Sequence, residues 1–177
     1  MTGSEATGLG ETGPMETNLA GTGLTKAGLV TTGLAKTLLV DAGVWKLLLG
    51  REWERRDPVM LGERERTVLE QFRLAVVERR VAMIGPVRQT VLSSVGNAAD
   101  FARAEEMLDP FRDEVVTQAD YVKAARLLNM CRIHGVQGGA TEMLLCAVAG
   151  RRGWEILTVD AGLERCVAVL RDEGLMA

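Results

Sequence analysis

The sequence has few of the residues that several protein classes require. It contains one histidine, His134, so a metal site built on several histidines is excluded, and Ser-His-Asp chemistry would depend on that residue alone. The three cysteines, Cys131, Cys146 and Cys166, fit buried thiols in a reducing cytosol better than a disulfide scaffold. No apolar run approaches the roughly 18 residues that would cross a membrane, and the N-terminus lacks the pattern of a secretory signal. We therefore expect a cytoplasmic protein without membrane association.

Charge of one sign is not in excess either. Lysine and arginine number 21 and aspartate and glutamate 24, which gives a formal net charge of −3 at pH 7. A protein that coats nucleic acid through bulk positive charge is therefore not expected, although a local basic groove is compatible with these numbers. With 47% hydrophobic residues, the 177-residue chain is long and apolar enough for one domain with a buried core.

The first 36 residues form a repeat that differs from the rest of the chain. A five-residue unit with the consensus Thr-Gly-Leu-x-x is repeated seven times with substitutions, and Ala27 fills a gap in the threonine series. A period of five can build a four-sided β-solenoid, but such a coil needs about four units, and stacked coils need several neighbours to bury a core. Glycine in most units also raises the entropic cost of ordering. We therefore expect residues 1–36 to be a flexible tail and residues 37–177 to form the domain, while a translation start assigned upstream of the real domain would also explain the repeat.

Behind the repeat, short apolar runs alternate with helical patterns. Buried strands are predicted over 37–41, 81–84 and 155–159, and the pattern also allows a last strand over 167–170. Helices are predicted from 44, over 63–80, from 86, over 98–108, from 117 to 134, over 142–152 and after 161, with a polar loop over 50–58. This alternation predicts an α/β protein in which a parallel β-sheet is flanked by helices. Sites in such folds lie at the carboxyl ends of the strands.

The helix predicted over 117–134 carries clear local signals. Thr117 is a favourable cap, and Asp120 follows it at the spacing of a capping box. Gly135 is expected to end the helix. The apolar stripe of this helix is predicted to consist of Tyr121, Ala125, Leu128 and Cys131.

Three carboxylates are candidates for a shared site. Asp41 and Asp160 each follow an apolar strand, so both are expected at the same edge of a parallel sheet, although either one alone is often only a turn residue. Glu142 lies in the first turn of the most apolar helix, where the helix dipole alone can also explain an acid. Three converging acids repel one another unless one is protonated or a cation binds, and oxygen ligands suit Mg²⁺ or Mn²⁺. Such an ion can activate water for in-line attack on a phosphate.

Segments in this order resemble the motifs of PIN domains. Residues 38–45 (LLVDAGVW) resemble the opening strand, 84–93 (IGPVRQTVLS) the second motif, 121–149 the third, and 156–160 (ILTVD) the fourth, while 108–114 (LDPFRDE) resembles the VapC-type subgroup, the toxins of toxin–antitoxin pairs. The resemblance covers residues 37–177. It implies a parallel sheet whose acids hold Mg²⁺ or Mn²⁺, cleavage of RNA, a cognate antitoxin protein that blocks the site, and a homodimer.

The chain departs from the PIN pattern at several positions. Thr90 stands where the family carries a Glu, and its hydroxyl is at most a weak neutral ligand. Glu142 stands where an Asp is usual, so its carboxylate is displaced by about a bond length. Gly162 replaces a further Asp, and Ala42 and Gly43 replace small hydroxyl residues that would hydrogen-bond the first acid. The catalytic residues and metal ligands that the resemblance leaves are Asp41, Glu142 and Asp160.

Basic and aromatic residues are the candidates for contact with RNA. Arg88, in the same helix as Thr90, is the preferred phosphate-binding residue, and Thr90 completes the expected substrate-binding pair. Trp53 is the tryptophan best placed to stack on a base, whereas Trp45 is expected in the core and His134 is expected to be structural. Further arginines that could line an RNA path, with solvated surface the alternative for each, are Arg51, Arg55, Arg56, Arg151 and Arg152.

Two functions of different classes follow from these residues. The first is a metal-dependent endoribonuclease of the VapC type, in which the three carboxylates hold the ion and Arg88 helps to hold the RNA. The second is a catalytically impaired PIN domain that acts as a protein- or RNA-binding module, which the missing acids at Thr90 and Gly162 favour. Binding of Mn²⁺ distinguishes them, because three ionised acids in one pocket should bind that ion measurably.

Overall fold

The computed structural model describes the backbone of residues 35–54 and 61–176, and the side chains of residues 35–50 and 61–176. The repeat up to residue 34 lies outside the described residues, so the division of the chain at residue 36 stays a prediction. In chain order the elements are β1 (Leu38–Val40), α1 (Ala42–Glu54), α2 (Glu63–Val77), β2 (Val81–Ile84), α3 (Gly85–Leu92), α4 (Ala98–Leu108), β3 (Asp113–Glu114), α5 (Gln118–Ile133), α6 (Ala140–Arg152), β4 (Glu155–Leu157) and α7 (Ala161–Asp172).

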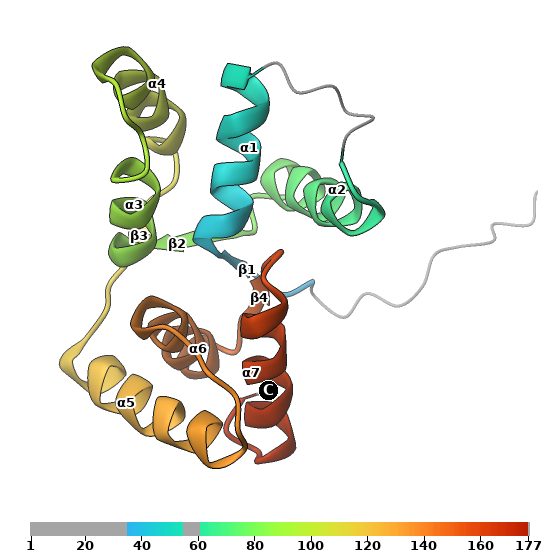
Figure 1. The fold of residues 1–177 in the computed structure, drawn as a ribbon, viewed down its shortest axis with the longest axis vertical. Helices are drawn as coiled ribbons and strands as arrows, with labels where there is room; N and C mark the ends of the chain where they lie inside the picture. The colour runs from blue at the N-terminus through green and yellow to red at the C-terminus, as the bar shows by residue number, and fades with distance from the viewer. Residues whose placement is uncertain (1–34, 55–60, 177) are drawn as a thin grey trace, which may run out of the picture. The chain divides into compact units, whose positions relative to one another are not determined.

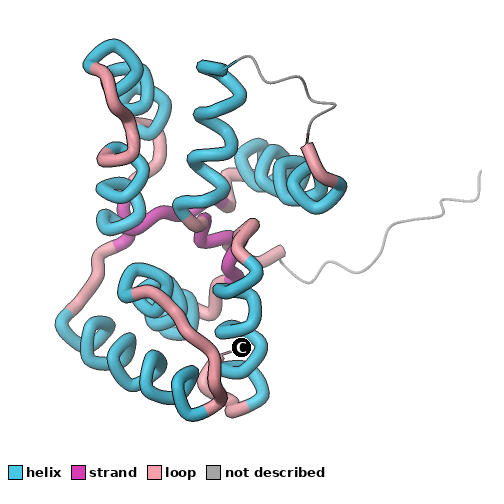
Figure 2. The backbone as a smooth tube through the Cα atoms, in the orientation of Figure 1, coloured by secondary structure: helices cyan, strands magenta, loops and turns pink. Residues whose placement is uncertain are grey.

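Four parallel strands form one sheet in the order β3-β2-β1-β4. Leu38 of β1 pairs with Val81 of β2 on one side and with Glu155 of β4 on the other. Parallel neighbours cannot be joined by a tight turn, so the chain returns through helices between strands. Figure 2 shows how short the strands are beside these helices. The predicted α/β class, a parallel sheet flanked by helices, is confirmed.

The helices pack in two groups. Helix α1 contacts α2 and α3, and α3 contacts α4, whereas α5 contacts α6 and α7. Figure 1 shows the two groups on opposite sides of the strands. Helix α6 is buried at every position over 143–149, which explains why this part of the chain is apolar all round. Within the described residues, no helix has the length and apolar composition that crossing a membrane requires.

Trp45 anchors the packing of α1, as predicted for a core residue. Its side chain is almost fully buried, and its ring meets Phe72 of α2 and Phe111 at centroid distances of 5.1 and 4.8 Å, both edge to face. The indole Nε1 is buried without a hydrogen-bond partner among the described residues. Trp45 therefore holds α1, α2 and the segment before β3 together by apolar packing alone.

Several predicted boundaries are wrong. The strand allowed over 167–170 lies inside α7, whose buried residues recur at helical rather than alternating spacing. The polar loop predicted over 50–58 is helical up to Glu54. Strand β3 consists of the two acidic residues Asp113 and Glu114, which carry no apolar strand pattern and are not predicted. Strand β4 ends at Leu157 instead of continuing to residue 159.

The buried face of α5 is one residue out of phase with the predicted stripe. Tyr121 is 53% exposed and Ala125 is also exposed, whereas Cys131 is buried as predicted. The predicted cap is confirmed: Thr117 Oγ1 accepts from the N–H of Asp120 at 3.3 Å, and Asp120 Oδ2 accepts from the N–H of Thr117 at 2.8 Å. The buried residues of α5 are Asp120, Ala124, Leu127 and Cys131.

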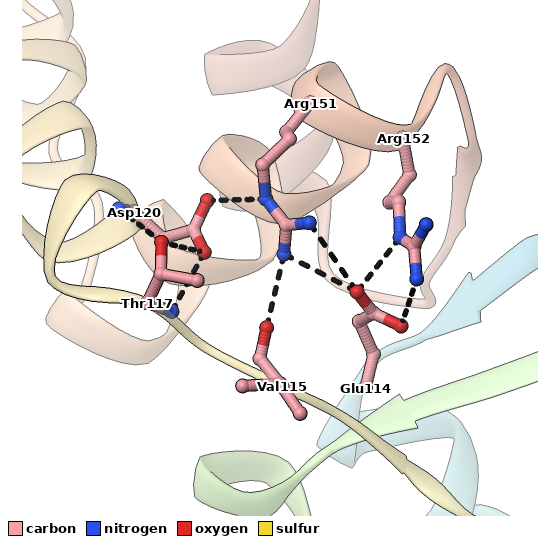
Figure 3. A network of polar contacts seen from close by, with 6 residues as sticks. All are labelled: Glu114, Val115, Thr117, Asp120, Arg151 and Arg152. Atoms are coloured by element: carbon pink, nitrogen blue, oxygen red, sulfur yellow. Dashed lines mark hydrogen bonds and ion pairs between the residues drawn. The ribbon is translucent and has the colours of Figure 1, made fainter.

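The buried face of α5 includes a charged residue, Asp120, which forms an ion pair with the partly exposed Arg151. The Asp120 carboxylate, whose side chain is 3% exposed, accepts from Arg151 Nε of α6 at 2.8 Å. Arg151 also donates to Glu114 of β3 at 3.3 Å, and Arg152 Nη2 donates to the same carboxylate at 2.6 Å (Figure 3). The start of α5, the end of α6 and strand β3 are thereby joined, and the phase of α5 follows from the inward position of a charged residue.

The contacts with Arg151 and Arg152 also set the protonation states of Asp120 and Glu114. Burial alone would raise the pKa of Asp120, but hydrogen bonds from Arg151 and Thr117 outweigh it and hold the pKa below its usual range. The hydrogen bond from Arg152 likewise lowers the pKa of Glu114. Both carboxylates are therefore ionised at neutral pH, as the pairing with two guanidinium groups requires.

Replacing Asp120 by Asn is expected to lower the free energy of unfolding at pH 7 by about 1–3 kcal/mol, because Arg151 loses its charged partner. The folded-state pKa lies below the unfolded value of about 3.9, so this stabilisation is complete above about pH 5 and is lost as the pH falls through the folded-state pKa. Urea unfolding followed from about pH 7 to about pH 3 should therefore depend less on pH in Asp120→Asn than in the wild type. Asp172→Asn, at an exposed position of α7, is the matched control, and equal behaviour of the two variants would contradict this role.

Candidate functional site

Asp41 lies at the carboxyl end of β1 and is 7% exposed. Its backbone N–H donates to the carbonyl of Leu157 at 2.9 Å, so the pairing with β4 continues one residue past β1. This register brings Thr158 beside Asp41, and Thr158 Oγ1 donates to Asp41 Oδ2 at 3.0 Å. The same hydroxyl oxygen accepts the N–H of Asp160 at 2.9 Å. A single buried hydroxyl therefore joins two of the three predicted acids.

Gly43 supports the same carboxylate from the first turn of α1. Its N–H donates to Asp41 Oδ2 at 3.3 Å. A Cβ at this position would lie 3.2 Å from that oxygen and 3.1 Å from Cγ2 of Val159, closer than most Cβ contacts. Gly43, which stands where the PIN pattern carries a hydroxyl residue, thus supplies a backbone donor to Asp41, and the site has little room for a side chain at this position.

Asp160 and Glu142 both cap helices. Asp160 Oδ1 accepts from the N–H groups of Gly162 and Leu163 at 2.5 and 2.9 Å and so caps α7. Glu142 Oε2 accepts from the N–H of Gly139 at 2.7 Å, which is the glutamate half of a capping box on α6. Capping alone explains these bonds, so they do not by themselves assign a catalytic role.

Each of the three carboxylates nevertheless leaves one oxygen without a hydrogen bond to any described residue. Asp41 is bound only through Oδ2, Asp160 only through Oδ1 and Glu142 only through Oε2. The remaining oxygens, Asp41 Oδ1, Asp160 Oδ2 and Glu142 Oε1, can accept a further partner. Three such oxygens form the donor set that a hard divalent cation prefers.

Buried thiols lie behind these acids. Burial raises the pKa of Cys146, and the neighbouring thiols and the carboxylates of Glu142 and Asp41 raise it further. Burial likewise raises the pKa of Cys166 to about 12; Glu142 is among the groups that add to this rise, and Arg165 opposes it. The charges of Glu142, on α6, and of Asp41, after β1, thus both disfavour the thiolate of Cys146. The thiols themselves stay protonated and unreactive.

The described residues do not form a ready-made metal centre. Over 35–50 and 61–176, no group of three or more histidine, cysteine, aspartate or glutamate side chains stands close enough together to hold an ion. The donor chemistry fits Mg²⁺ or Mn²⁺, and a ligand role through both oxygens would require Glu142 to release the N–H of Gly139. The structure therefore brings Asp41 and Asp160 to one edge through Thr158, whereas the Glu142 side chain folds back onto Gly139.

The two predicted substrate-binding residues make internal contacts. Thr90 Oγ1 donates to the carbonyl of Pro86 at 2.8 Å, one turn back in α3. Arg88 Nε donates to both carboxylate oxygens of Asp113 at 3.1 Å, and its two terminal nitrogens donate to the carbonyls of Leu108 and Phe111. Arg88 thus fastens the end of α4 to β3, and its nitrogens are already engaged.

The other candidates for RNA contact either bind other residues of the chain or have side chains outside the described residues. Arg151 and Arg152 belong to the network of Figure 3, and Arg152 also lies over the Trp154 ring at 5.2 Å from its centroid. His134 Nε2 lies 3.1 Å from Glu173 Oε1, which fits the structural role predicted for it. The side chains of Arg51, Arg55, Arg56 and Trp53 lie outside the described residues.

Thr158 is the functional candidate that sequence reasoning missed. It is 6% exposed and stands two residues before Asp160. The signal was available: a threonine at the end of a buried strand, next to the strand that ends in Asp41, is positioned to donate to that acid. Recognising it required the register of β1 against β4, which the chain pattern does not specify.

Comparison with known proteins supports the fold. No protein-family model matches the chain, and no curated protein matches it. The structure is similar to the crystal structure of FitAcB from Neisseria gonorrhoeae, with a TM-score of 0.51 and 17% sequence identity over 75% of this chain and 94% of that chain. At this identity the similarity concerns the fold alone. The chain is an α/β protein with a PIN-like fold, and Asp41 and Asp160 lie at the carboxyl edge of its sheet.

Replacing Thr158 by Val is expected to lower the free energy of unfolding by about 1–3 kcal/mol, because Asp41 loses a donor and the N–H of Asp160 loses its acceptor. The volume of the side chain hardly changes, so the loss reports the hydroxyl. Thr90→Val is the matched control, since its hydroxyl bonds only within its own helix. Urea unfolding of the two variants measures the difference, and equal stability losses would show that Thr158 has no special role.

Proposed function

We propose that this protein is a metal-dependent endoribonuclease of the VapC type, with Asp41, Glu142 and Asp160 as the ligands of one Mg²⁺ or Mn²⁺. The observation that carries the proposal is the pair Asp41 and Asp160, which follow neighbouring parallel strands, are joined through Thr158, and each keep one carboxylate oxygen without a hydrogen bond to any described residue. Sites of α/β proteins lie at the carboxyl ends of such strands. The PIN-like fold and the order of the sequence motifs support the same assignment.

The residues divide the work according to their contacts. Asp41 is held by Thr158 and Gly43, so its orientation does not depend on an ion. Asp160 is held by the first N–H groups of α7 and keeps Oδ2 available. An ion bound here supplies an activated water and stabilises the charge that develops on a phosphodiester. With two acids of the PIN pattern replaced by Thr90 and Gly162, the donor set supports one ion and not two.

RNA cleavage by the full-length chain is expected with Mn²⁺ or Mg²⁺ and not with EDTA. Asp41→Asn should reduce the rate by at least about 100-fold, because the best-held ligand loses its charge. Asp109→Asn, at an exposed position after α4, is the matched control and should cleave like the wild type. Cleavage that persists in EDTA or in Asp41→Asn would contradict the proposal.

Metal binding gives a readout that does not depend on activity. Mn²⁺ should raise the melting temperature of the wild-type protein more than that of Asp41→Asn, since only binding to the folded state stabilises it. Equal shifts in the two proteins would show that the ion binds elsewhere.

A specific observation favours a second candidate, a catalytically impaired PIN domain that binds protein or RNA. The hydroxyl of Thr90 donates to its own helix and supplies no charge where the PIN pattern carries a Glu. Under this alternative the wild type does not cleave RNA, and Thr90→Glu restores cleavage. A cognate antitoxin protein, a homodimer and a cytoplasmic location remain predictions from the sequence.

A further inference from the structure

Three of the six arginines expected to contact RNA are bound to other partners, and the side chains of the other three lie outside the described residues. Arg88 binds Asp113, and Arg151 and Arg152 bind Glu114 and Asp120. A guanidinium that already holds carboxylates and carbonyls is poorly available for a phosphate. Within the part of the chain that the structure describes, a phosphate at this site therefore calls for another cation beside the acids.

Arg165 is an exposed cation in this position. It lies in the second turn of α7, three residues after Gly162 and five after Asp160, so its side chain extends back over the first turn of the helix. Its Nη2 lies 3.9 Å from the point where a Cβ of Gly162 would stand, and Asp160 Oδ1 lies 2.8 Å from the same point. The arginine and the candidate ligand therefore both lie beside the glycine.

Two further observations bear on this placement. Arg165 forms no ion pair within 4.0 Å of any carboxylate in the described residues, although Asp160 is its neighbour. The charge of Arg165 also lowers the pKa of Cys166, which burial and the carboxylate of Glu142 raise. Arg165 thus lies near Asp160 without forming an ion pair with it or with Glu142.

We propose that Arg165 binds a backbone phosphate of the RNA beside Asp160, as a substrate-binding residue that the sequence motifs do not reveal. This inference rests on the proposed function and specifies how the same site holds its substrate. The planar guanidinium donates two parallel hydrogen bonds to a phosphate, which fixes the position of the phosphate as well as neutralising its charge.

Gly162 makes this placement possible. An aspartate there, as in the PIN pattern, would put a Cβ 2.8 Å from Asp160 Oδ1 and a carboxylate beside Arg165, which would then form an ion pair instead of meeting substrate. The glycine removes that competing acid. The site then combines carboxylates for one ion with one arginine for the phosphate.

The test compares Arg165→Gln, Arg165→Lys and Arg126→Gln in the full-length chain carrying Asp41→Asn, which prevents cleavage during binding. Arg126 is an exposed arginine of α5 and serves as the matched control. The probe is a fluorescein-labelled single-stranded RNA of mixed sequence, and its affinity is measured by anisotropy over a series of salt concentrations. Cleavage by each arginine variant with Asp41 intact is measured separately.

Arg165→Gln is expected to weaken RNA binding about tenfold and to reduce the slope of log affinity against log salt by about 0.7, the value for one phosphate contact on a single strand. Arg165→Lys should retain the salt slope but lose part of the affinity, because lysine offers charge without the planar fork. Arg126→Gln should leave both quantities unchanged.

The outcomes separate this inference from the proposed function. If the wild type cleaves RNA in a metal-dependent way but Arg165→Gln binds like Arg126→Gln, the nuclease stands and the role of Arg165 is wrong. If no protein cleaves RNA but Arg165→Gln selectively loses binding and salt slope, the nuclease fails and the phosphate site stands. Absence of RNA binding by the protein with Arg165 intact overturns the inference.

Discussion

The candidate site depends on the parallel pairing of β1 with β4. The pairing continues one residue past the end of β1, where the N–H of Asp41 donates to the carbonyl of Leu157. This register places the hydroxyl of Thr158 beside the Asp41 carboxylate. Buried carboxylates need donors, and Thr158 supplies one to Asp41 while it accepts the N–H of Asp160. A shift of register by one residue would turn Thr158 to the opposite face of the sheet and separate the two acids.

The acids of the site also hold local structure. Asp160 caps α7, Glu142 completes the cap of α6, and Asp41 accepts from the N–H of Gly43 at the start of α1. A carboxylate has two oxygens with about two acceptor positions each, so one side chain can satisfy a helix N-terminus and still accept another partner. Catalysis and capping are therefore compatible at Asp41 and Asp160. At Glu142, the longer side chain folds back onto Gly139 through Oε2, which leaves Oε1 as the oxygen for a further partner.

The arginines show how tertiary contacts decide which charges are available. Arg88, Arg151 and Arg152 look alike in the sequence, and all three fasten β3 to the elements around it. This anchoring has a physical cause, because β3 is only two residues long and its acids need partners. Arg165 does not form such an ion pair, because its neighbours toward the start of α7 are Gly162, which has no side chain, and Asp160, whose Oδ1 already accepts from two backbone N–H groups.

Much of the fold was predictable because it depends on local patterns. The helix over 98–108, the strand over 81–84, the cap formed by Thr117 and Asp120, and the left-handed Gly135 all appear where the chain pattern indicates them. The predicted stripe of α5 failed because a periodicity argument treats a charged residue as exposed, whereas Arg151 draws Asp120 inward. The strand allowed over 167–170 failed because four apolar residues fit either a short strand or a buried helix.

The sequence by itself determined the alternation of strands and helices, the parallel sheet and the presence of two acids at its carboxyl edge, because hydrophobic periodicity and capping residues act over a few neighbouring positions. Only the tertiary structure decided the contacts of the site residues. Thr158 links Asp41 to Asp160, and Glu142 folds back onto Gly139. Arg88 binds Asp113, whereas Arg165 forms no ion pair among the described residues. These contacts join residues far apart in the chain, up to 117 positions for Thr158 and Asp41. They depend on strand order, register and helix packing, which no local pattern encodes.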